Sequence, residues 1–113
     1  MPDRIVYKVM SEAEHQQMRR DGVFCGSPAD MQDGYIHLSC GSQLAATLNR
    51  HFGLVEGLML VAVDLSRLDD SVRWEPARGG ELFPHIYGRL PVEAVLAVAP
   101  LEREADGTVR LPA

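Results

Sequence analysis

The chain has 113 residues, of which 46% are hydrophobic, and this suits a single compact domain over residues 1–113. Its net charge of -5 provides no broad basic surface for DNA or RNA, and its apolar runs are far shorter than the roughly 20 residues that span a bilayer. The first residues carry no signal-peptide pattern, so we expect a cytoplasmic protein without a nucleic-acid or membrane partner.

The N-terminal segment predicts a strand followed by a surface helix. Residues 5–10 are mostly apolar and are typical of a strand. Ser11 and Glu14 fit a capping box, so a helix is expected to begin here, to continue to about Arg20 and to end at Gly22. The next expected pieces are a short extended segment at 23–25 and a loop or single turn from Ser27-Pro28.

A strand with one polar face is predicted at Tyr35–Leu38, after a turn at Asp33-Gly34. Side chains alternate between the two faces of a strand. Ile36 and Leu38 are therefore expected to point into the core. The same alternation places Tyr35, His37 and Ser39 together on the opposite face, where they can line a ligand site.

A second helix is predicted from about Ser42 to His51, ended by Gly53. Arg50 and His51 lie in its last turn, where the helix dipole favours positive charge. For His51 the pattern favours a capping role over a ligand contact. The inner stripe of this helix is expected to consist of Leu44, Ala45, Leu48 and Phe52.

Several short strands are predicted in the second half of the chain. The strongest, Leu58–Leu65, is almost entirely apolar and is expected at the centre of a sheet. The remaining predictions are a turn at 66–70, a strand at 72–75, a loop at 76–84, a short strand at 86–88, a turn at 89–91, a strand at 95–99 and a hairpin at 101–111 around Asp106-Gly107. Two early helices followed by many short strands predict an α+β domain with a strongly bent or split sheet.

The stretch from Arg73 to Gly88 has an unusual composition for a segment that only connects two strands. It holds the only tryptophan beside arginines, glutamates, a histidine and a tyrosine. Aromatic surface next to a few polar groups is typical of a small-molecule pocket. Residues 33–39 have the same character. We therefore expect these two stretches to meet across one cleft and to bind a small-molecule ligand.

Glu75 is the strongest acid candidate. Between Trp74 and Pro76 it is expected to be partly desolvated, which raises the pKa of a carboxyl group and suits acid-base catalysis. The alternative is an ion pair with Arg73 or Arg78. Trp74, together with Tyr87, offers a surface on which a planar ring can stack, although packing in the core is the more common role of tryptophan.

Two histidines are candidates for the same cleft. His37 suits a donor to a ribose or an amide, or a half-buried side chain bonded to the backbone. His85 follows Pro84, which fixes the backbone that aims its side chain. Because His37, His51 and His85 show none of the short spacings of metal-binding histidines, no metal site is expected.

Cys25 and Cys40 are expected to be mostly buried thiols rather than a disulfide, because disulfides are rare in a reducing compartment. A catalytic cysteine would need a base beside it. The three-residue spacing from His37 to Cys40 places the two side chains on opposite faces of a strand. The sequence therefore does not favour nucleophilic cysteine chemistry.

The chain resembles the small bacterial domain-of-unknown-function family 952. The motifs that carry the resemblance are Ile-Val-Tyr-Lys at 5–8, Asp-Gly-Tyr-Ile-His-Leu-Ser at 33–39, Arg-Trp-Glu-Pro at 73–76 and Leu-Phe-Pro-His-Ile-Tyr-Gly at 82–88. That family is similar to the ADP-ribosyltransferase fold, whose members bind NAD between two small sheets. The resemblance implies a split β-sheet core with two or three short helices on its outside.

The resemblance also implies NAD as a ligand and roles for individual residues in ADP-ribosyl transfer. Lys8 occupies the position that holds the ribose near nicotinamide, and Tyr35 or His37 occupies the position that contacts nicotinamide. The catalytic position falls on His85, with Glu75 on the preceding segment.

The cleft residues give three open alternatives. In an enzyme, Arg50 or Arg73 would pair with phosphate, beside the ligand contacts of Tyr35, His37 and Ser39. The other two alternatives are a non-catalytic ligand-binding module and a structural or partner-binding domain. The oligomeric state stays open.

Overall fold

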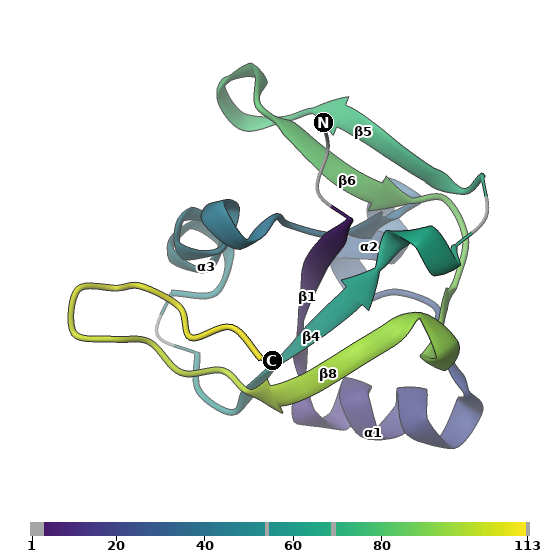
Figure 1. The fold of residues 1–113 in the computed structure, drawn as a ribbon, viewed down its shortest axis with the longest axis horizontal. Helices are drawn as coiled ribbons and strands as arrows, with labels where there is room; N and C mark the ends of the chain where they lie inside the picture. The colour runs from purple at the N-terminus through teal and green to yellow at the C-terminus, as the bar shows by residue number, and fades with distance from the viewer. Residues whose placement is uncertain (1–3, 54, 69, 113) are drawn as a thin grey trace.

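A computed structural model of the protein describes residues 4–53, 55–68 and 70–112. Its strands form three small antiparallel sheets, and its few helices lie around them, as Figure 1 shows. This arrangement confirms the predicted α+β class with a divided sheet.

The first sheet has the order β1-β4-β8 and consists of β1 (Ile5–Ser11), β4 (Leu58–Asp64) and β8 (Val95–Pro100). Strand β4 is central, as its apolar sequence predicted, and six of its seven side chains are buried. It pairs with β1 from Ile5↔Asp64 to Ser11↔Leu58. The main apolar core packs against this sheet.

The second sheet has the order β3-β6-β5 and consists of β3 (Ile36–His37), β6 (Leu82–Ile86) and β5 (Val72–Pro76). Strand β6 begins earlier than predicted, so the predicted loop at 76–84 and the strand at 86–88 were wrong. The turn is confined to residues 77–81, where Gly79 and Gly80 take φ angles of +64° and +79°. Pro84 lies inside the strand opposite Trp74 of β5, and its carbonyl accepts a hydrogen bond from the backbone nitrogen of Leu38.

The two larger sheets meet at one point beside the site described below. A β-bridge joins Tyr7 of β1 to Ser39, two residues beyond β3, through backbone hydrogen bonds of 2.8 and 2.9 Å in both directions. A third, two-stranded sheet pairs β2 (Val23–Phe24) with β7 (Leu90–Pro91). The segment at 89–91, predicted as a turn, therefore contains a short strand.

Three α-helices surround the sheets. Helix α1 (Glu12–Asp21) begins with the predicted capping box of Ser11 and Glu14. Helix α2 (Pro28–Asp33), where a loop or single turn was expected, has a capping box of its own between Ser27 and Asp30. The third, α3 (Leu44–His51), starts two residues later than predicted, after a 3-10 turn at 41–43.

The inner face of α3 differs from the prediction at one position. Leu44 and Leu48 are fully buried as expected, but Ala45 is exposed, and Thr47 is the residue that turns towards β3. A helical residue is rotated by about 100° from its neighbour, so Ala45 points away from the face that carries Leu44 and Leu48.

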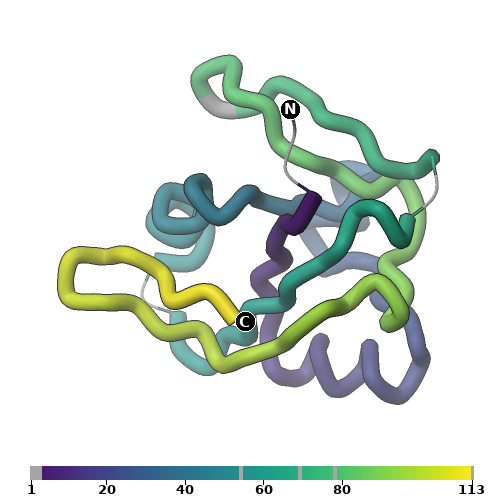
Figure 2. The backbone as a smooth tube through the Cα atoms, viewed as in Figure 1, coloured from purple at the N-terminus to yellow at the C-terminus, as the bar shows by residue number. Residues whose placement is uncertain are grey.

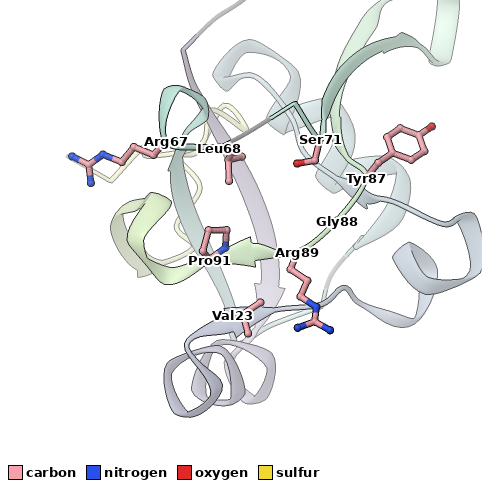
Figure 3. A pocket seen from close by; sticks show the side chains of 8 residues that line it. All are labelled: Val23, Arg67, Leu68, Ser71, Tyr87, Gly88, Arg89 and Pro91. Carbon is pink, nitrogen blue, oxygen red and sulfur yellow. The ribbon is translucent and has the colours of Figure 1, made fainter.

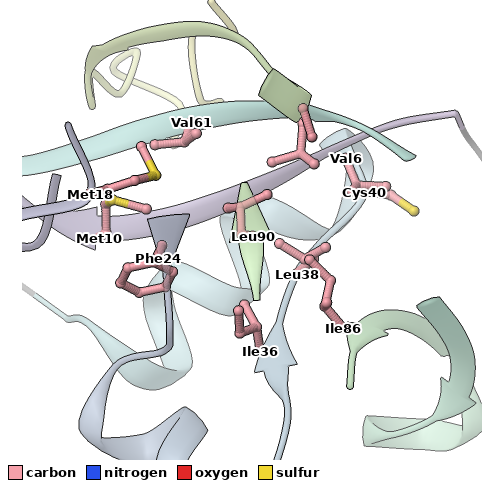
Figure 4. Packing of buried hydrophobic residues seen from close by; sticks show 12 residues of the cluster. Val6, Met10, Met18, Phe24, Ile36, Leu38, Cys40, Val61, Ile86 and Leu90 are labelled. Carbon is pink, nitrogen blue, oxygen red and sulfur yellow. The ribbon is translucent and has the colours of Figure 1, made fainter. Parts of the chain in front are cut away.

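The apolar core has two parts. The larger cluster lies between the first sheet, α1 and β3, and includes Val6, Met18, Ile36, Leu38 and Ile86, as Figure 4 shows. The burial of Ile36 and Leu38 confirms the predicted alternation. The smaller cluster packs α3 against β1 and β4, and its members are Val9, Leu44, Leu48, Leu58, Leu60 and Val109.

The C-terminal segment forms the predicted hairpin, seen in yellow in Figure 2. Its turn is closed by a hydrogen bond of 2.9 Å from the backbone of Gly107 to that of Glu104, and a β-bridge joins Arg103 to Val109. Both cysteines remain thiols: Cys40 is buried as expected, whereas Cys25 is exposed. None of the helices in the described residues has the length and apolar character to cross a bilayer.

Candidate functional site

A cavity of about 730 Å³ opens where β1, β3 and β6 meet helices α2 and α3. Its wall contains residues from both stretches that the sequence singled out, 33–39 and 73–88. Of the residues predicted to contact a ligand or to act as catalysts, those that line this cavity are Lys8, Tyr35, His37, Ser39, Arg50 and His85.

Asp30 is the polar centre of this cavity wall, and the sequence did not identify it. Its carboxylate is almost completely buried, with Oδ2 2.8 Å from the Lys8 ammonium and 2.9 Å from the backbone nitrogen of Ser27. Its other oxygen, Oδ1, lies 2.6 Å from Nδ1 of His37 and 3.1 Å from that residue's backbone nitrogen. One carboxylate thus joins β1, α2 and β3.

The electrostatics of Asp30 follow from these contacts. Burial alone would raise the pKa of this carboxyl group. The hydrogen bond from His37 and the charge and hydrogen bond of Lys8 outweigh burial, and they hold the pKa of Asp30 well below its ordinary value. Asp30 is therefore a carboxylate at neutral pH, and it compensates the buried charge of Lys8.

His37 lies between two carboxylates of α2. Its Nδ1 contacts Asp30, and its Nε2 is 2.9 Å from Oδ2 of Asp33, on the solvent side of the helix. The imidazole is 37% exposed, so its edge reaches the cavity. These two contacts, one at the middle and one at the C-terminal end of the short helix α2, attach it to β3.

His85 is buried at the other side of the cavity and is held by Glu75. Its Nδ1 lies 2.8 Å from Oε1 of Glu75, and the same oxygen accepts a hydrogen bond of 2.7 Å from the hydroxyl of Tyr87. These two hydrogen bonds lower the pKa of Glu75. The predicted rise in that pKa was wrong, because Glu75 is partly exposed and has two donors instead of an apolar surrounding.

Glu75 makes these two hydrogen bonds in place of the ion pair predicted with Arg73. Arg73 lies near enough for its charge to contribute weakly to the lowered pKa of Glu75, and its guanidinium stands 5.7 Å from the centre of the Tyr87 ring. The side chain of Arg78 lies outside the part of the chain that the structure describes.

Tyr35 covers both histidines. Its ring stacks on His85 at 4.1 Å between centroids and with an angle of 27°, and it contacts His37 at 4.7 Å. Burial, followed by the carboxylate of Asp33, raises the pKa of Tyr35. The phenol therefore stays protonated at neutral pH and can donate a hydrogen bond to a ligand.

The remaining wall combines hydroxyl groups, a cation and apolar surface. The hydroxyl of Ser39 lies 3.0 Å from that of Thr47 on α3. Arg50 and His51, from the last turn of the same helix, also line the cavity, so His51 faces the site. Apolar surface comes from Val9, Pro28, Ala29, Leu38, Phe52, Pro76, Ala77 and Phe83.

Three of the predicted ligand contacts lie outside this wall. Trp74 packs against the main core, because it alternates with Arg73 and Glu75 on β5 and points to the opposite face. Arg73 stands over Tyr87. Tyr87 lines a second cavity of about 540 Å³, shown in Figure 3.

The second cavity is poorly arranged to bind an anion. Arg67 and Arg89 are its two cations, and Figure 3 shows their side chains extending in different directions. Arg67 also lies 3.5 Å from the carboxylate of Asp64 and donates a hydrogen bond to the backbone of Glu93. The two guanidinium groups therefore do not converge on one ligand.

The carboxylate of Asp30 was missed because it lies on α2, where only a loop or single turn was expected. The local signal was present, since Ser27 and Asp30 have the spacing of a capping box and Pro28 suits the first turn of a helix. What the pattern could not show is that Asp30 also meets Lys8 and His37. Among the described residues, no group of three histidine, cysteine or acidic side chains is arranged to hold a metal ion.

Comparisons with known proteins give the family and the fold. The family described as "Protein of unknown function (DUF952)" matches residues 9–98. A crystal structure of protein CC0527 from Caulobacter crescentus is similar with 40% identity and a TM-score of 0.85, over 94% of this chain and 93% of that one. The solution structure of CC0527 gives 40% identity and a TM-score of 0.79, over 95% and 91%. No curated protein is significantly similar to the chain.

Proposed function

This chain belongs to the DUF952 family, and we propose that its main cavity binds NAD or a related nucleotide for chemistry of the ADP-ribosyl-transfer type. The observation that carries the proposal is the convergence, in one cavity, of the Tyr35-His85 stack, the hydroxyl of Ser39 and the guanidinium of Arg50. A nucleotide needs these three features: a surface for a flat ring, partners for ribose hydroxyl groups and a cation for phosphate.

The cations of the cavity have different roles in this proposal. Lys8 is held by Asp30, so its charge is already compensated within the protein. Arg50 is exposed at the end of α3 and is the cation that can turn towards a phosphate group. The apolar surface of Phe52 and Phe83 offers a second place for an aromatic base.

Bound NAD would supply an activated ribose that can be transferred to an acceptor. In the protein, His85 is the group that would accept a proton from that acceptor, because its ring lines the cavity. Glu75 contributes through His85, whose Nδ1 it holds. Tyr35 and His37 would orient the ligand from the β3 side.

Thermal unfolding in the presence of NAD, ADP-ribose or nicotinamide tests this proposal. A ligand present at about 100 times its dissociation constant stabilises the native state by roughly 2.7 kcal/mol. In a domain of this size that corresponds to a rise in Tm of several degrees. We expect NAD and ADP-ribose to raise Tm in the wild-type protein.

Two arginine variants make the result specific. Arg50→Gln removes the exposed cation of the cavity wall, and Arg19→Gln removes an exposed arginine of α1 that is not part of the wall. The proposal predicts that Arg50→Gln reduces the shift and that Arg19→Gln retains it. Absence of a shift with all three compounds at millimolar concentration would exclude this function.

A non-catalytic ligand-binding module is the second candidate. It is favoured by the position of Glu75, whose Oε1 already accepts hydrogen bonds from His85 and Tyr87 and which is not among the residues that line the cavity. This candidate predicts that NAD raises Tm without release of nicotinamide, which chromatography of the incubated nucleotide would detect. Release of nicotinamide would favour the enzyme.

A further inference from the structure

His37 and His85 are direct partners across two neighbouring strands. They face each other in the pairing of β3 with β6, their ring centres are 5.5 Å apart, and the planes meet at 71°. Both rings line the main cavity. Their surroundings differ in a way that assigns a different protonation state to each ring.

His37 has a carboxylate at each ring nitrogen. Nδ1 lies 2.6 Å from Asp30 and Nε2 lies 2.9 Å from Asp33. An ionised carboxylate only accepts hydrogen bonds, and a neutral imidazole has a single N–H group. Nδ1 is hydrogen-bonded to Asp30, and Nε2 lies beside the charge of Asp33 without being hydrogen-bonded to it, so a proton on each nitrogen is stabilised by a nearby carboxylate. The ring with two protons suits these surroundings, and its Nε2 proton can be given to a substrate.

His85 has one carboxylate, at Nδ1. The contact of 2.8 Å with Glu75 is satisfied by a single N–H group, so the neutral ring with its proton on Nδ1 suffices. In that tautomer Nε2 carries a lone pair and can accept a proton. The Tyr87 hydroxyl donates a hydrogen bond to the same oxygen of Glu75 and helps to hold that carboxylate in place.

We propose that His37 and His85 form a general acid and general base that cleave a phosphodiester bond of a nucleotide. Glu75 and Asp33 are positioning residues that set the two protonation states. The inference rests on the proposed function only in placing a nucleotide in this cavity, and it concerns a different bond.

In the reaction, a water molecule gives a proton to Nε2 of His85 while its oxygen forms a bond to phosphorus. The bond from phosphorus to the ester oxygen breaks, and that oxygen takes the proton from Nε2 of His37. The products are an alcohol and a phosphate monoester. His85 ends protonated and His37 neutral, and both are restored by proton exchange with solvent, which reaches the partly exposed His37.

The general acid His37 is the reason to favour cleavage of a phosphodiester bond over cleavage of the glycosidic bond of NAD. Nicotinamide leaves the ribose as a neutral molecule and needs no proton, whereas an alkoxide is a poor leaving group unless it is protonated as it departs. A protonated His37 therefore serves an ester substrate. Arg50 at the same cavity provides the charge for the phosphate group.

The pH dependence depends on every charged group around the two rings. His37 is surrounded by Asp30 and Asp33 from α2, with Lys8 behind Asp30, and by the rings of Tyr35 and His85. The neighbours of His85 are Glu75, Tyr35 and His37. A reaction that needs one ring protonated and the other neutral has a bell-shaped pH profile.

The first test measures the protonation states in the protein without ligand. Two-bond proton-nitrogen correlations in NMR distinguish the two tautomers and the cation of each histidine. At pH 7 we expect the cation for His37 and the tautomer with its proton on Nδ1 for His85. A neutral His37, or a proton on Nε2 of His85, would overturn the assignment without any need for a variant.

The second test measures hydrolysis of 2′,3′-cyclic AMP, with chromatography of the products. We expect turnover with a bell-shaped pH profile, and losses in kcat of roughly 10²- to 10⁴-fold for His37→Gln and His85→Gln. His15→Gln, on α1 outside the cavity wall, is the matched control and keeps full activity. Glu75→Gln is expected to move the acid limb of the pH profile, which reports the base His85, and a purely structural residue would leave that limb in place.

The outcomes separate this inference from the proposed function. Failure to hydrolyse the cyclic nucleotide would overturn the inference, and a rise in Tm with NAD would then leave the proposed function intact. Hydrolysis without any stabilisation by NAD would support the inference and exclude the proposed NAD site. Equal activity of wild type, His37→Gln and His85→Gln would also overturn the acid-base pair.

Discussion

Lys8 and Asp30 form an ion pair in which both side chains are buried. The ammonium lies 2.8 Å from the carboxylate, and the side chains are only 7% and 2% exposed. The pair connects the middle of β1 to a helix 22 positions later in the chain. A wall of the main cavity is thereby attached to the sheet that carries the core.

Loss of Asp30 is expected to destabilise the protein strongly. Asp30→Ala leaves the buried Lys8 without its partner, and removal of one member of a buried ion pair typically costs about 3–5 kcal/mol. Urea unfolding of wild type and variant measures this difference. Asp21→Ala, at an exposed position of α1, is the control and should stay within about 0.5 kcal/mol of wild type. A loss below about 1 kcal/mol for Asp30→Ala would contradict the central role of this carboxylate.

The same carboxylate predicts how stability depends on pH. Folding lowers the pKa of Asp30 from its ordinary value of 3.8, so its contribution is complete above that value and is lost as the pH falls below it. We expect the unfolding free energy of wild type to decrease between about pH 5 and pH 2. Asp30→Asn should be less stable at pH 7 and should lose less over the same range. Parallel curves for the two proteins would show that Asp30 titrates normally.

Most of the first sheet and the start of α1 could be predicted because their signals are local. The apolar run of β4 requires burial on both faces, and the Ser11-Glu14 capping box marks where a helix begins. The alternation of Tyr35, Ile36 and His37 likewise separated the site face from the core face correctly.

The rest depended on contacts between distant segments. Pro84 is read as a loop residue on local grounds, yet in β6 its carbonyl accepts a hydrogen bond from the backbone of Leu38. Asp30 falls in a stretch that was predicted only as a loop or single turn, and its importance comes from Lys8 and His37, which only the folded chain brings to it. Glu75 acquired its donors in the same way.

Gly26 is expected to be more sensitive to substitution than other glycines in turns. It takes a φ of +126°, and a Cβ atom there would lie 3.0 Å from the Cβ of Asp30. Gly26→Ala therefore combines backbone strain, which costs about 1–3 kcal/mol, with displacement of α2. Gly107→Ala is the matched control, because its φ of +91° carries strain while no atom lies within 4 Å of the added group.

Urea unfolding compares these two glycine variants. The prediction requires a larger loss of stability in Gly26→Ala than in Gly107→Ala, together with altered NMR signals of His37, which α2 holds. Equal losses would mean that α2 moves away from Gly26 without cost.

Substitution of Trp74 distinguishes effects on the core from effects on the cavity. Because it packs against the main core and is only partly buried, Trp74→Leu should lower the unfolding free energy by about 1–3 kcal/mol, less than a fully buried tryptophan would. The rise in Tm caused by NAD should be unchanged. In Tyr35→Leu the rise in Tm caused by NAD should be reduced, because the Tyr35 ring lines the cavity and stacks on His85. If a folded Trp74→Leu protein no longer responded to NAD, the ligand would have to lie against the core-facing side of β5 instead of in the main cavity.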